Sequence, residues 1–439
     1  MEEIVIIGGG VSGISSAVIL AENGFKPILI ESRKYLGGRV RSFINELSGD
    51  VIDNGQHLFL GCYNYTFKLF RKLDTFKFLV KNFPSNIEFR DRYSGISNLS
   101  YPAIFNPQIG SMLAILKFKN LSIKEKLLIF PLINYILLND VNPNETVKNL
   151  LDRFKQSSNI CYRLWNPIVI ATINSSPELA SASLFVNVMK EGFLGKGNSS
   201  LLYFSNTGLS NLFINSTKII ENSSGKVLYN SSVSKIFFHN SYYRIVFKDN
   251  SEIKTKNIIS SVPSDVLSRI INDDKILKSS LNIPEFKYSP IISIYIWFKG
   301  HYNLPLFNAL TGTRIEWLFN KRKMFTENKE NTLISCTISS AEELSKLTNT
   351  DLYNIVIDEL KICYKELKNA EVLDFEIIKE NRATPIFTPE AQRMRLKTKT
   401  ILKGFYLSGD WTDTKLPATI EGGVKSGFKA AELFLKDCK

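Results

Sequence analysis

The first 31 residues impose the strongest constraint on the fold of this chain. They run from the apolar stretch "IVII" at 4–7 through a glycine-rich segment at 8–13 and an apolar-periodic segment to about Asn23, and end with "PILIE" at 27–31. This order predicts a strand, a tight turn, a helix closed by Gly24 and a second parallel strand. Such a complete βαβ unit indicates an α/β protein with a Rossmann-like domain.

The residue types in this unit point to dinucleotide binding. Gly8 permits the tight turn, Gly10 lets backbone amides, including that of Ser12, approach a pyrophosphate, and Gly13 lets helix and strand pack closely. Glu31 follows about 20 residues later, where a carboxylate accepts hydrogen bonds from a ribose hydroxyl. A glycine turn of purely structural use is the alternative, but strand, helix, second strand and terminal acid all occur in the required order.

The next segment distinguishes between dinucleotides. "ESRKYLGGRVRS" at 31–42 places Gly37, Gly38 and Arg39 just after the second strand, and a guanidinium there can bind phosphate. This turn resembles the GGR motif of the amine oxidase and carotenoid desaturase superfamily of flavoproteins. The resemblance implies FAD as the cofactor.

The C-terminal segment "FYLSGDWTDTKLPATIEGGVKSGFKAAELFL" at 405–435 carries the second half of that resemblance. In the superfamily, the acid after this strand, here Asp410 beside Gly409, binds oxygens of FAD. The amides that open the following helix, here near Thr419 and Ile420, face the flavin ring. An ordinary glycine-rich helix is the alternative.

A third segment, 225–263, reads as short alternating strands and ends in the strand "NIISSVP". Val233 occupies the position at which superfamily members contact adenine through backbone atoms. Cofactor-binding sequence therefore occurs at the start, middle and end of the chain. We predict a discontinuous, amine-oxidase-like FAD domain and a second α+β domain for substrate; the FAD domain comprises residues 1–90, 215–270 and 400–439, and the substrate domain comprises 91–214 and 271–399.

Composition restricts the class of protein. The chain has 439 residues, of which 44% are hydrophobic, and its net charge of +13 is scattered, with no dense basic run to bind nucleic acid. Five cysteines without CxxC spacing argue against a disulfide framework, a zinc site or an iron–sulfur cluster, so we expect no metal. The acidic start "MEE" is unlike a signal peptide, which favours the cytoplasm.

Segment 105–140 is apolar over several helical turns and is interrupted by Lys117, Lys119, Lys124 and Lys126. Its longest apolar stretch, about a dozen residues from Leu127, is too short to span a bilayer. A core helix pair is one interpretation. The other is a lysine-rimmed apolar surface that dips into the inner face of the cytoplasmic membrane and admits an apolar substrate.

The resemblance extends to a narrower family. Five segments are similar to the bacterial hydroxysqualene dehydroxylases: "VIDNGQHLFLGCYNYTFKLFRKL" at 51–73, "LWNPIVIATINSSPELASA" at 164–182, "WLFN" at 317–320, "RATPIFTPEAQ" at 382–392 and "SGDWTDTKLPATIEGGVKSG" at 408–427. These flavoproteins act in hopanoid synthesis. The resemblance implies reduction of hydroxysqualene to squalene with loss of water, while the electron donor that reduces FAD stays unknown.

This reaction needs apolar walls, a proton donor and the flavin edge. The strand after GGR brings its glycine to the flavin in this superfamily, so Gly55, Gln56 and His57 belong there. His57 is the candidate donor, because histidine carries a proton near neutral pH, or else a neutral histidine that shapes the pocket. Asp413 and Thr412 are rival donors.

Three tryptophans and two histidines complete the candidates. Trp165, Trp297 and Trp317 could wall the substrate site and stabilise a passing cation, or could be ordinary core residues. His239 and His301 lie in polar stretches, which indicates surface positions.

Two other functions stay open. A carotenoid-type desaturase would use the same fold and FAD to abstract hydride from a polyene precursor such as phytoene, in the reverse redox direction. A prenyl-binding escort protein would bind lipid tails without redox chemistry. The escort is disfavoured because the phosphate loop, Glu31, the GGR turn and the C-terminal GDW are all present.

Overall fold

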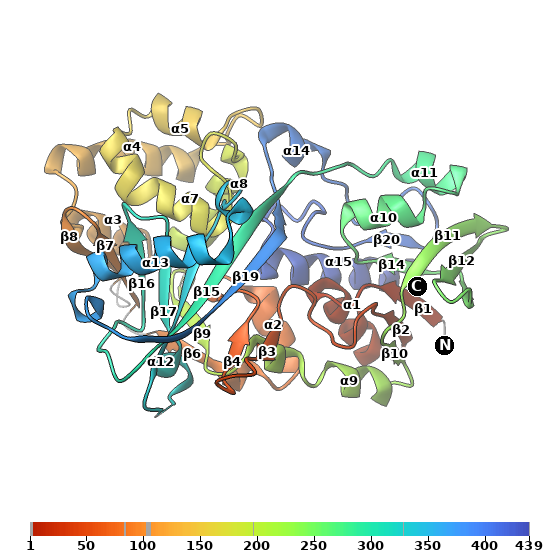
Figure 1. Ribbon diagram of the computed structural model, residues 1–439. Helices are drawn as coiled ribbons and strands as arrows, with labels where there is room; N and C mark the ends of the chain where they lie inside the picture. Colours follow the sequence, from red (N-terminus) through yellow and green to blue (C-terminus); the bar gives the residue numbers. More distant parts are fainter. Residues whose placement is uncertain (1–2, 83–84, 102–106, 196, 328, 439) are drawn as a thin grey trace.

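The computed structural model describes residues 3–82, 85–101, 107–195, 197–327 and 329–438 (Figure 1). The half of the molecule that is predicted to bind the nucleotide is built on a five-stranded parallel sheet, the nucleotide sheet. The order of strands in this sheet is β10 (Lys226–Leu228), β2 (Lys26–Ile30), β1 (Glu3–Ile7), β14 (Ile258–Ser260) and β20 (Phe405–Leu407). The predicted βαβ unit is therefore confirmed, and it supplies the central strand β1 and the neighbouring strand β2.

Two helices from opposite ends of the chain pack against each other beside this sheet, α1 (Val11–Glu22) and α15 (Ile420–Asp437) (Figure 1). A Cβ atom at Gly427 would lie 2.2 Å from the carbonyl oxygen of Ser12, and one at Gly423 would lie 2.8 Å from a methyl group of Val11. Only glycine fits such contacts. These glycines therefore allow α15 to pack closely against α1.

The predicted alternating strands of 225–263 are also present. A three-stranded antiparallel sheet follows β10 and contains β11 (Val233–His239), β12 (Tyr242–Phe247) and β13 (Glu252–Thr255). Along β12 the buried residues alternate with exposed ones, because only one face of this sheet packs on the core. His239 and His301 are exposed, as predicted.

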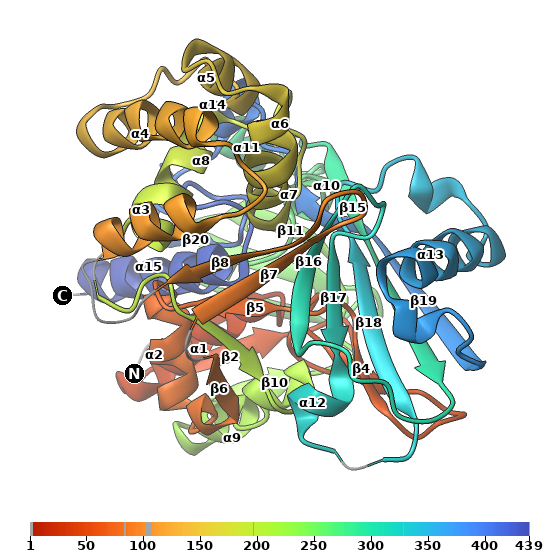
Figure 2. The ribbon, with the colours of Figure 1, turned by 90° about the vertical axis from the view of Figure 1, so that its left-hand side faces the viewer.

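A seven-stranded sheet forms the second half of the molecule, and all its pairs are antiparallel except β16 with β7. Its order is β19 (Val372–Pro385), β15 (Tyr288–Phe298), β18 (Thr332–Ile338), β17 (Trp317–Asn320), β16 (Phe307–Thr311), β7 (Ser85–Asp91) and β8 (Gly95–Tyr101). Helix α13 (Asn349–Cys363) covers one face with Leu352, Val356 and Leu360 (Figure 2).

A layer of helices gathers above this sheet (Figure 2). It contains α3 (Pro107–Lys117), α4 (Ile123–Leu138), α5 (Val147–Arg153), α6 (Ser158–Ile160), α7 (Asn166–Ile173) and α8 (Ala182–Val188). Helices α3 and α4 form the predicted apolar pair, although residues 105 and 106 of that segment lie outside the described residues. Within the described parts of the chain, no helix combines the length and hydropathy that a membrane span requires.

The remaining α-helices and strands are short. They are β3 (Ser42–Ile44), β4 (Val51–Asp53), β5 (Leu58–Leu60), α2 (Asn64–Lys72), β6 (Leu79–Asn82), β9 (Leu202–Ser205), α9 (Ser216–Asn222), α10 (Ser264–Ile270), α11 (Lys275–Leu281), α12 (Lys321–Phe325) and α14 (Pro389–Met394). The nucleotide sheet takes its strands from three separate parts of the chain, as a discontinuous domain requires. The domain boundaries themselves stay a prediction; the one at residue 90 falls within β7, which pairs in the seven-stranded sheet.

Candidate functional site

The turn between β1 and α1 leads into a helix N-terminus that has no side-chain cap. Gly8 has φ +104°, a conformation that side chains disfavour, and Gly10 is the N-cap of α1 without a side-chain capping bond. A Cβ atom at Gly10 would meet nothing within 4 Å, whereas one at Gly13 would lie 1.9 Å from the carbonyl oxygen of Gly8. Gly10 therefore borders open space, and Gly13, next to the buried Ser12, is required for packing.

Glu31 lies at the carboxyl end of β2 with its side chain buried. Its carboxylate accepts hydrogen bonds from the amides of Gly9 and Arg33, both at 2.8 Å. Its backbone carbonyl accepts from the amide of Ser231, 2.9 Å away and two residues before Val233. Glu31, the predicted ribose ligand, thus lies at the carboxyl end of β2 beside the segment that leads to Val233, the predicted adenine contact.

The two glycine turns are in contact. The amide of Gly37 donates to the carbonyl of Gly9 at 2.8 Å, and a Cβ atom at Gly38 would lie 3.2 Å from the Cα of Gly10. Gly38 has φ +62°, so this turn needs glycine for both its conformation and its close approach. The predicted GGR turn therefore adjoins the phosphate loop.

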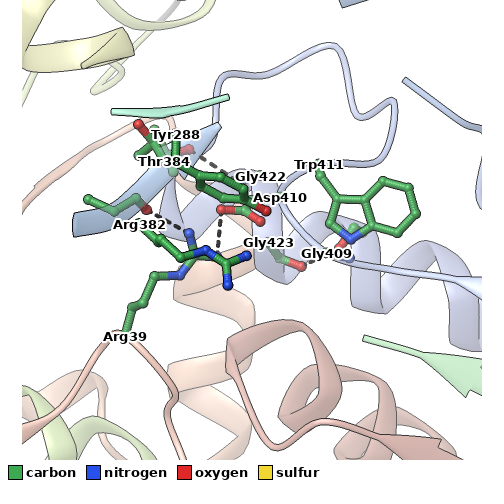
Figure 3. Close-up of polar contacts among 12 residues, drawn as sticks. Arg39, Tyr288, Arg382, Thr384, Gly409, Asp410, Trp411, Gly422 and Gly423 are labelled. Atoms are coloured by element: carbon green, nitrogen blue, oxygen red, sulfur yellow. Dashed lines mark hydrogen bonds and ion pairs between the residues drawn. The ribbon is translucent and has the colours of Figure 1, made fainter. Parts of the chain in front are cut away.

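Arg39 and Asp410 form an ion pair at 2.7 Å, although 371 residues separate them in the chain (Figure 3). The guanidinium also donates to the carbonyl of Ala383 at 2.6 Å. Both residues were predicted to bind the cofactor, and the structure brings them together. A paired guanidinium and carboxylate have fixed positions and retain further hydrogen-bonding atoms for a ligand.

The loop that carries Asp410 is held by residues that sequence reasoning missed. Arg395, which is buried after α14, donates to the carbonyl of Asp410 at 3.0 Å and to that of Leu416 at 2.7 Å. Burial lowers the pKa of Arg395 to about 10, so the guanidinium still carries its charge at pH 7. Gly409 has φ +130° and lies against the ring of Trp411 (Figure 3). No local motif around Arg395 marks this function.

Thr419 is the N-cap of α15, and its hydroxyl accepts from the amide of Gly422 at 3.2 Å. Ile420 is the first residue of the helix. The carboxylate of Glu421 accepts from the backbone amides of Tyr65 and Thr66 at 3.0 and 2.8 Å, which caps the first turn of α2. The helix predicted to face the flavin thus begins at Ile420, and Glu421 links it to α2.

A small pocket adjoins this helix terminus. Its apolar walls include Leu60, Val188 and Leu416, and its polar residues include Tyr63 and Thr419. Burial raises the pKa of the Tyr63 phenol above its usual value, so the hydroxyl keeps its proton. The remaining residues around the pocket are Cys62, Thr172, Glu191, Gly192, Pro417 and Glu421.

None of the three predicted tryptophans lines this pocket. Trp165 is buried in the core, with its indole N–H on the side chain of Gln156 at 2.9 Å. Trp297 is also buried and donates to the carboxylate of Asp50 at 2.7 Å, while Trp317 stacks on Phe319. These contacts favour the interpretation of Trp165 and Trp297 as core residues.

Gly55, Gln56 and His57 lie between β4 and β5. Burial lowers the pKa of His57 to about 4, so the imidazole is neutral at pH 7. A neutral imidazole favours the interpretation of His57 as a residue that shapes the pocket over its interpretation as the proton donor. Asp413 forms an ion pair with Lys415 at 3.2 Å and, like Thr412, does not line the pocket.

The residues present fit a bound dinucleotide. The uncapped N-terminus of α1 suits a diphosphate, and the carboxylate of Glu31 suits ribose hydroxyls. Gln56 supplies a further sign, because its side-chain Nε2 is buried and finds no partner among the described residues. A buried donor of this kind indicates that a ligand provides the acceptor.

Comparison with known proteins agrees with this geometry. The model of the family described as flavin containing amine oxidoreductase matches residues 11–435. A hydroxysqualene dehydroxylase of Rhodopseudomonas palustris is 27% identical over 98% of this chain and 97% of its own length. A 15-cis-phytoene desaturase of Capsicum annuum is 25% identical over 99% of this chain and 78% of its own length.

Among solved structures, the cyclohexylamine oxidase of Brevibacterium oxydans shares the fold with a TM-score of 0.73 at 13% identity, over 100% of this chain and 99% of that one. The predicted α/β class and the predicted cofactor are therefore confirmed. The chain belongs to the flavin containing amine oxidoreductase family and is an FAD-dependent oxidoreductase.

Proposed function

We propose that this protein is a hydroxysqualene dehydroxylase, which reduces hydroxysqualene to squalene with loss of water in squalene and hopanoid synthesis. The observation that carries the proposal is the extent of the match. The dehydroxylase of Rhodopseudomonas palustris and this chain match over nearly the whole of both, whereas the phytoene desaturase of Capsicum annuum has about a fifth of its length outside the match. The pocket beside the start of α15 has apolar side chains in its walls, as a site for an isoprenoid would require.

The reaction breaks the allylic carbon–oxygen bond of the substrate, and the hydroxyl leaves as water after it takes up a proton. Bound FAD, once reduced, supplies the hydride that the carbon receives. The protein must exclude bulk water from the allylic centre and bind the hydroxyl before it leaves. In this proposal Leu60, Val188 and Leu416 provide the dry surface, and the hydroxyls of Tyr63 and Thr419 bind the substrate oxygen.

The test is incubation of the purified holoenzyme, reduced with dithionite, with hydroxysqualene. Formation of squalene, detected by gas chromatography and mass spectrometry, is the expected result. The electron donor in the cell stays unidentified, so a chemical reductant replaces it.

A phytoene or carotenoid desaturase is the second candidate, because phytoene desaturases match 99% of this chain at similar identity. The oxidised holoenzyme with phytoene and a quinone acceptor tests it. A desaturated product from phytoene, without squalene from the first incubation, would replace the proposed function with this one.

We further propose that the protein acts at the cytoplasmic surface of a membrane. Helices α3 and α4 bury one side in the core through residues such as Ile129 and Ile133, and large apolar side chains remain exposed on the other. The exposed set is Met112, Leu116, Ile123, Leu127, Leu128 and Leu138. Lysines that suit anionic headgroups, among them Lys117 and Lys124, are interspersed with this apolar face and are exposed.

A further inference from the structure

The side chain of Gln56 is fixed in one orientation. It is 9% exposed, and its carbonyl Oε1 accepts a hydrogen bond from the Lys321 ammonium at 2.9 Å. An ammonium group can only donate, so the amide oxygen must face Lys321 and the amide nitrogen must face away. That nitrogen, Nε2, is buried and has no partner in the described part of the chain.

Lys321 is itself held from several directions. Its ammonium lies 2.8 Å from the Asp53 carboxylate, with both side chains 1% exposed, and 4.0 Å from the centre of the Phe325 ring. Asp53 in turn accepts from the backbone amide of Leu209 at 2.9 Å. Because the buried ion pair cannot shift without losing these contacts, it sets the orientation of the Gln56 amide.

The loop with Gln56 adjoins the cofactor-binding turn. The side-chain amide of Asn54 donates to the carbonyl of Arg39 at 3.2 Å, and Arg39 pairs with Asp410. A Cβ atom at Gly55 would find its nearest neighbour, the Ser293 hydroxyl, 3.7 Å away, so a bound group can approach the backbone here. The flavin ring of FAD carries carbonyl oxygens and ring nitrogens that accept hydrogen bonds.

We propose that Nε2 of Gln56 donates a hydrogen bond to the flavin ring, and that Lys321 is the positioning residue that aims it. The inference rests on FAD as the cofactor and not on the identity of the isoprenoid. Reduction places negative charge on the flavin ring, so an aimed donor stabilises reduced FAD more than oxidised FAD. The pair Lys321 and Asp53 thereby raises the reduction potential of the bound flavin without touching it.

Two measurements without any isoprenoid test this: the Kd of the apoprotein for FAD, from quenching of flavin fluorescence, and the reduction potential of the holoenzyme. Gln56→Leu removes the amide and leaves the ion pair in place. We expect the ratio of the affinity for reduced FAD to the affinity for oxidised FAD to fall threefold to tenfold. A change of this size corresponds to the loss of one hydrogen bond. For a two-electron couple this lowers the potential by about 15 to 30 mV. Gln56→Glu keeps the acceptor toward Lys321 and replaces only the donor, so it should lower the potential at least as far.

The double variant Lys321→Met with Asp53→Asn removes both charges, so that neither is left buried and unpaired. It releases the Gln56 amide and should lower the potential by part of the Gln56→Leu effect. The matched control is Gln156→Leu, because Gln156 is a buried glutamine whose amide is fully bonded to protein groups. The control should leave the potential unchanged.

Wild-type affinity and potential in both Gln56 variants would overturn the proposed hydrogen bond. A wild-type potential in the double variant, with a lowered one in Gln56→Leu, would overturn the positioning by Lys321. Failure to form squalene bears on the proposed function alone, since neither measurement uses substrate.

Discussion

At the scale of single residues, Gly10 and Gly13 occupy the same turn but serve different purposes. A side chain at Gly10 would extend into open space from an ordinary backbone conformation, with φ −73°, whereas one at Gly13 would collide with backbone. We therefore expect Gly10→Val to fold and to purify without FAD, because the added methyl groups occupy the space for phosphate. Absorbance near 450 nm and circular dichroism measure the two properties.

Gly13→Val is the comparison for that experiment. Its Cβ would lie 1.9 Å from the carbonyl of Gly8, so this variant should fail to reach the native fold. A Gly10→Val protein that retains yellow FAD would contradict the assignment of the open space to the cofactor.

The neutral state of His57 predicts a dependence of stability on pH. Its pKa is about 4 in the folded protein, against 6.5 in the unfolded chain, so the unfolded chain binds the extra proton between these values. The contribution of the neutral imidazole to the free energy of unfolding is fully present above pH 6.5. It is lost as the pH falls toward 4, by up to about 3 kcal/mol. Urea unfolding of wild type and His57→Asn from pH 7.5 to 4.5 should show that the variant loses less stability.

An equal loss in both proteins would show that His57 does not titrate as the structure indicates. The same variant distinguishes the two roles of this residue. If His57 were the acid, its substitution should slow dehydroxylation at least about a hundredfold; a neutral histidine that shapes the pocket predicts a smaller effect.

At the scale of elements, α3 and α4 show how one segment satisfies two interpretations. The sequence allowed either a core helix pair or a membrane-contacting surface, and the structure contains a buried face and an exposed apolar face on the same helices. Burial of Ile129 and Ile133 explains the core role, while Ile123, Leu127 and Leu138 are exposed to solvent.

Substitution on the exposed face tests the membrane proposal. We expect Leu127→Asp with Ile123→Asp to bind phosphatidylglycerol vesicles at least tenfold more weakly, because both side chains are exposed and the new charges repel the headgroups. Sedimentation with vesicles measures binding, and phosphatidylcholine vesicles are the uncharged comparison. Leu132→Asp, a change at a buried position of α4, should instead unfold the helix layer. Undiminished sedimentation of the exposed-face variant would refute the membrane contact.

At the scale of the whole molecule, the cofactor site is assembled from segments distant in the chain. Strands of the nucleotide sheet come from residues 3–30, 226–260 and 405–407. The Arg39–Asp410 pair joins the turns that follow the first and the last of these ranges. A ligand that contacts all three segments stabilises them together, since it binds only the folded arrangement.

This assembly predicts that FAD stabilises the protein as one unit. At a free FAD concentration of 100 times the Kd, the free energy of unfolding should rise by about 2.7 kcal/mol. Tryptophan fluorescence reports on both halves, through Trp297 in the seven-stranded sheet and Trp411 beside the nucleotide sheet, and flavin fluorescence reports on the cofactor. Both transitions should move to higher temperature together; a tryptophan transition that does not respond to FAD would show that the halves unfold independently.

The sequence alone determined the βαβ unit, its glycines, the terminal Glu31 and the GGR and GDW turns, since these depend on local backbone conformation and on spacing along the chain. Only the tertiary structure decided which distant side chains meet. Arg395 and Lys321 have no local signature, and their functions arise because folding buries each charge beside its partners. Folding also lowers the pKa of His57 and buries Trp165 and Trp297 in the core, because the cost of desolvation depends on neighbours that no local pattern specifies.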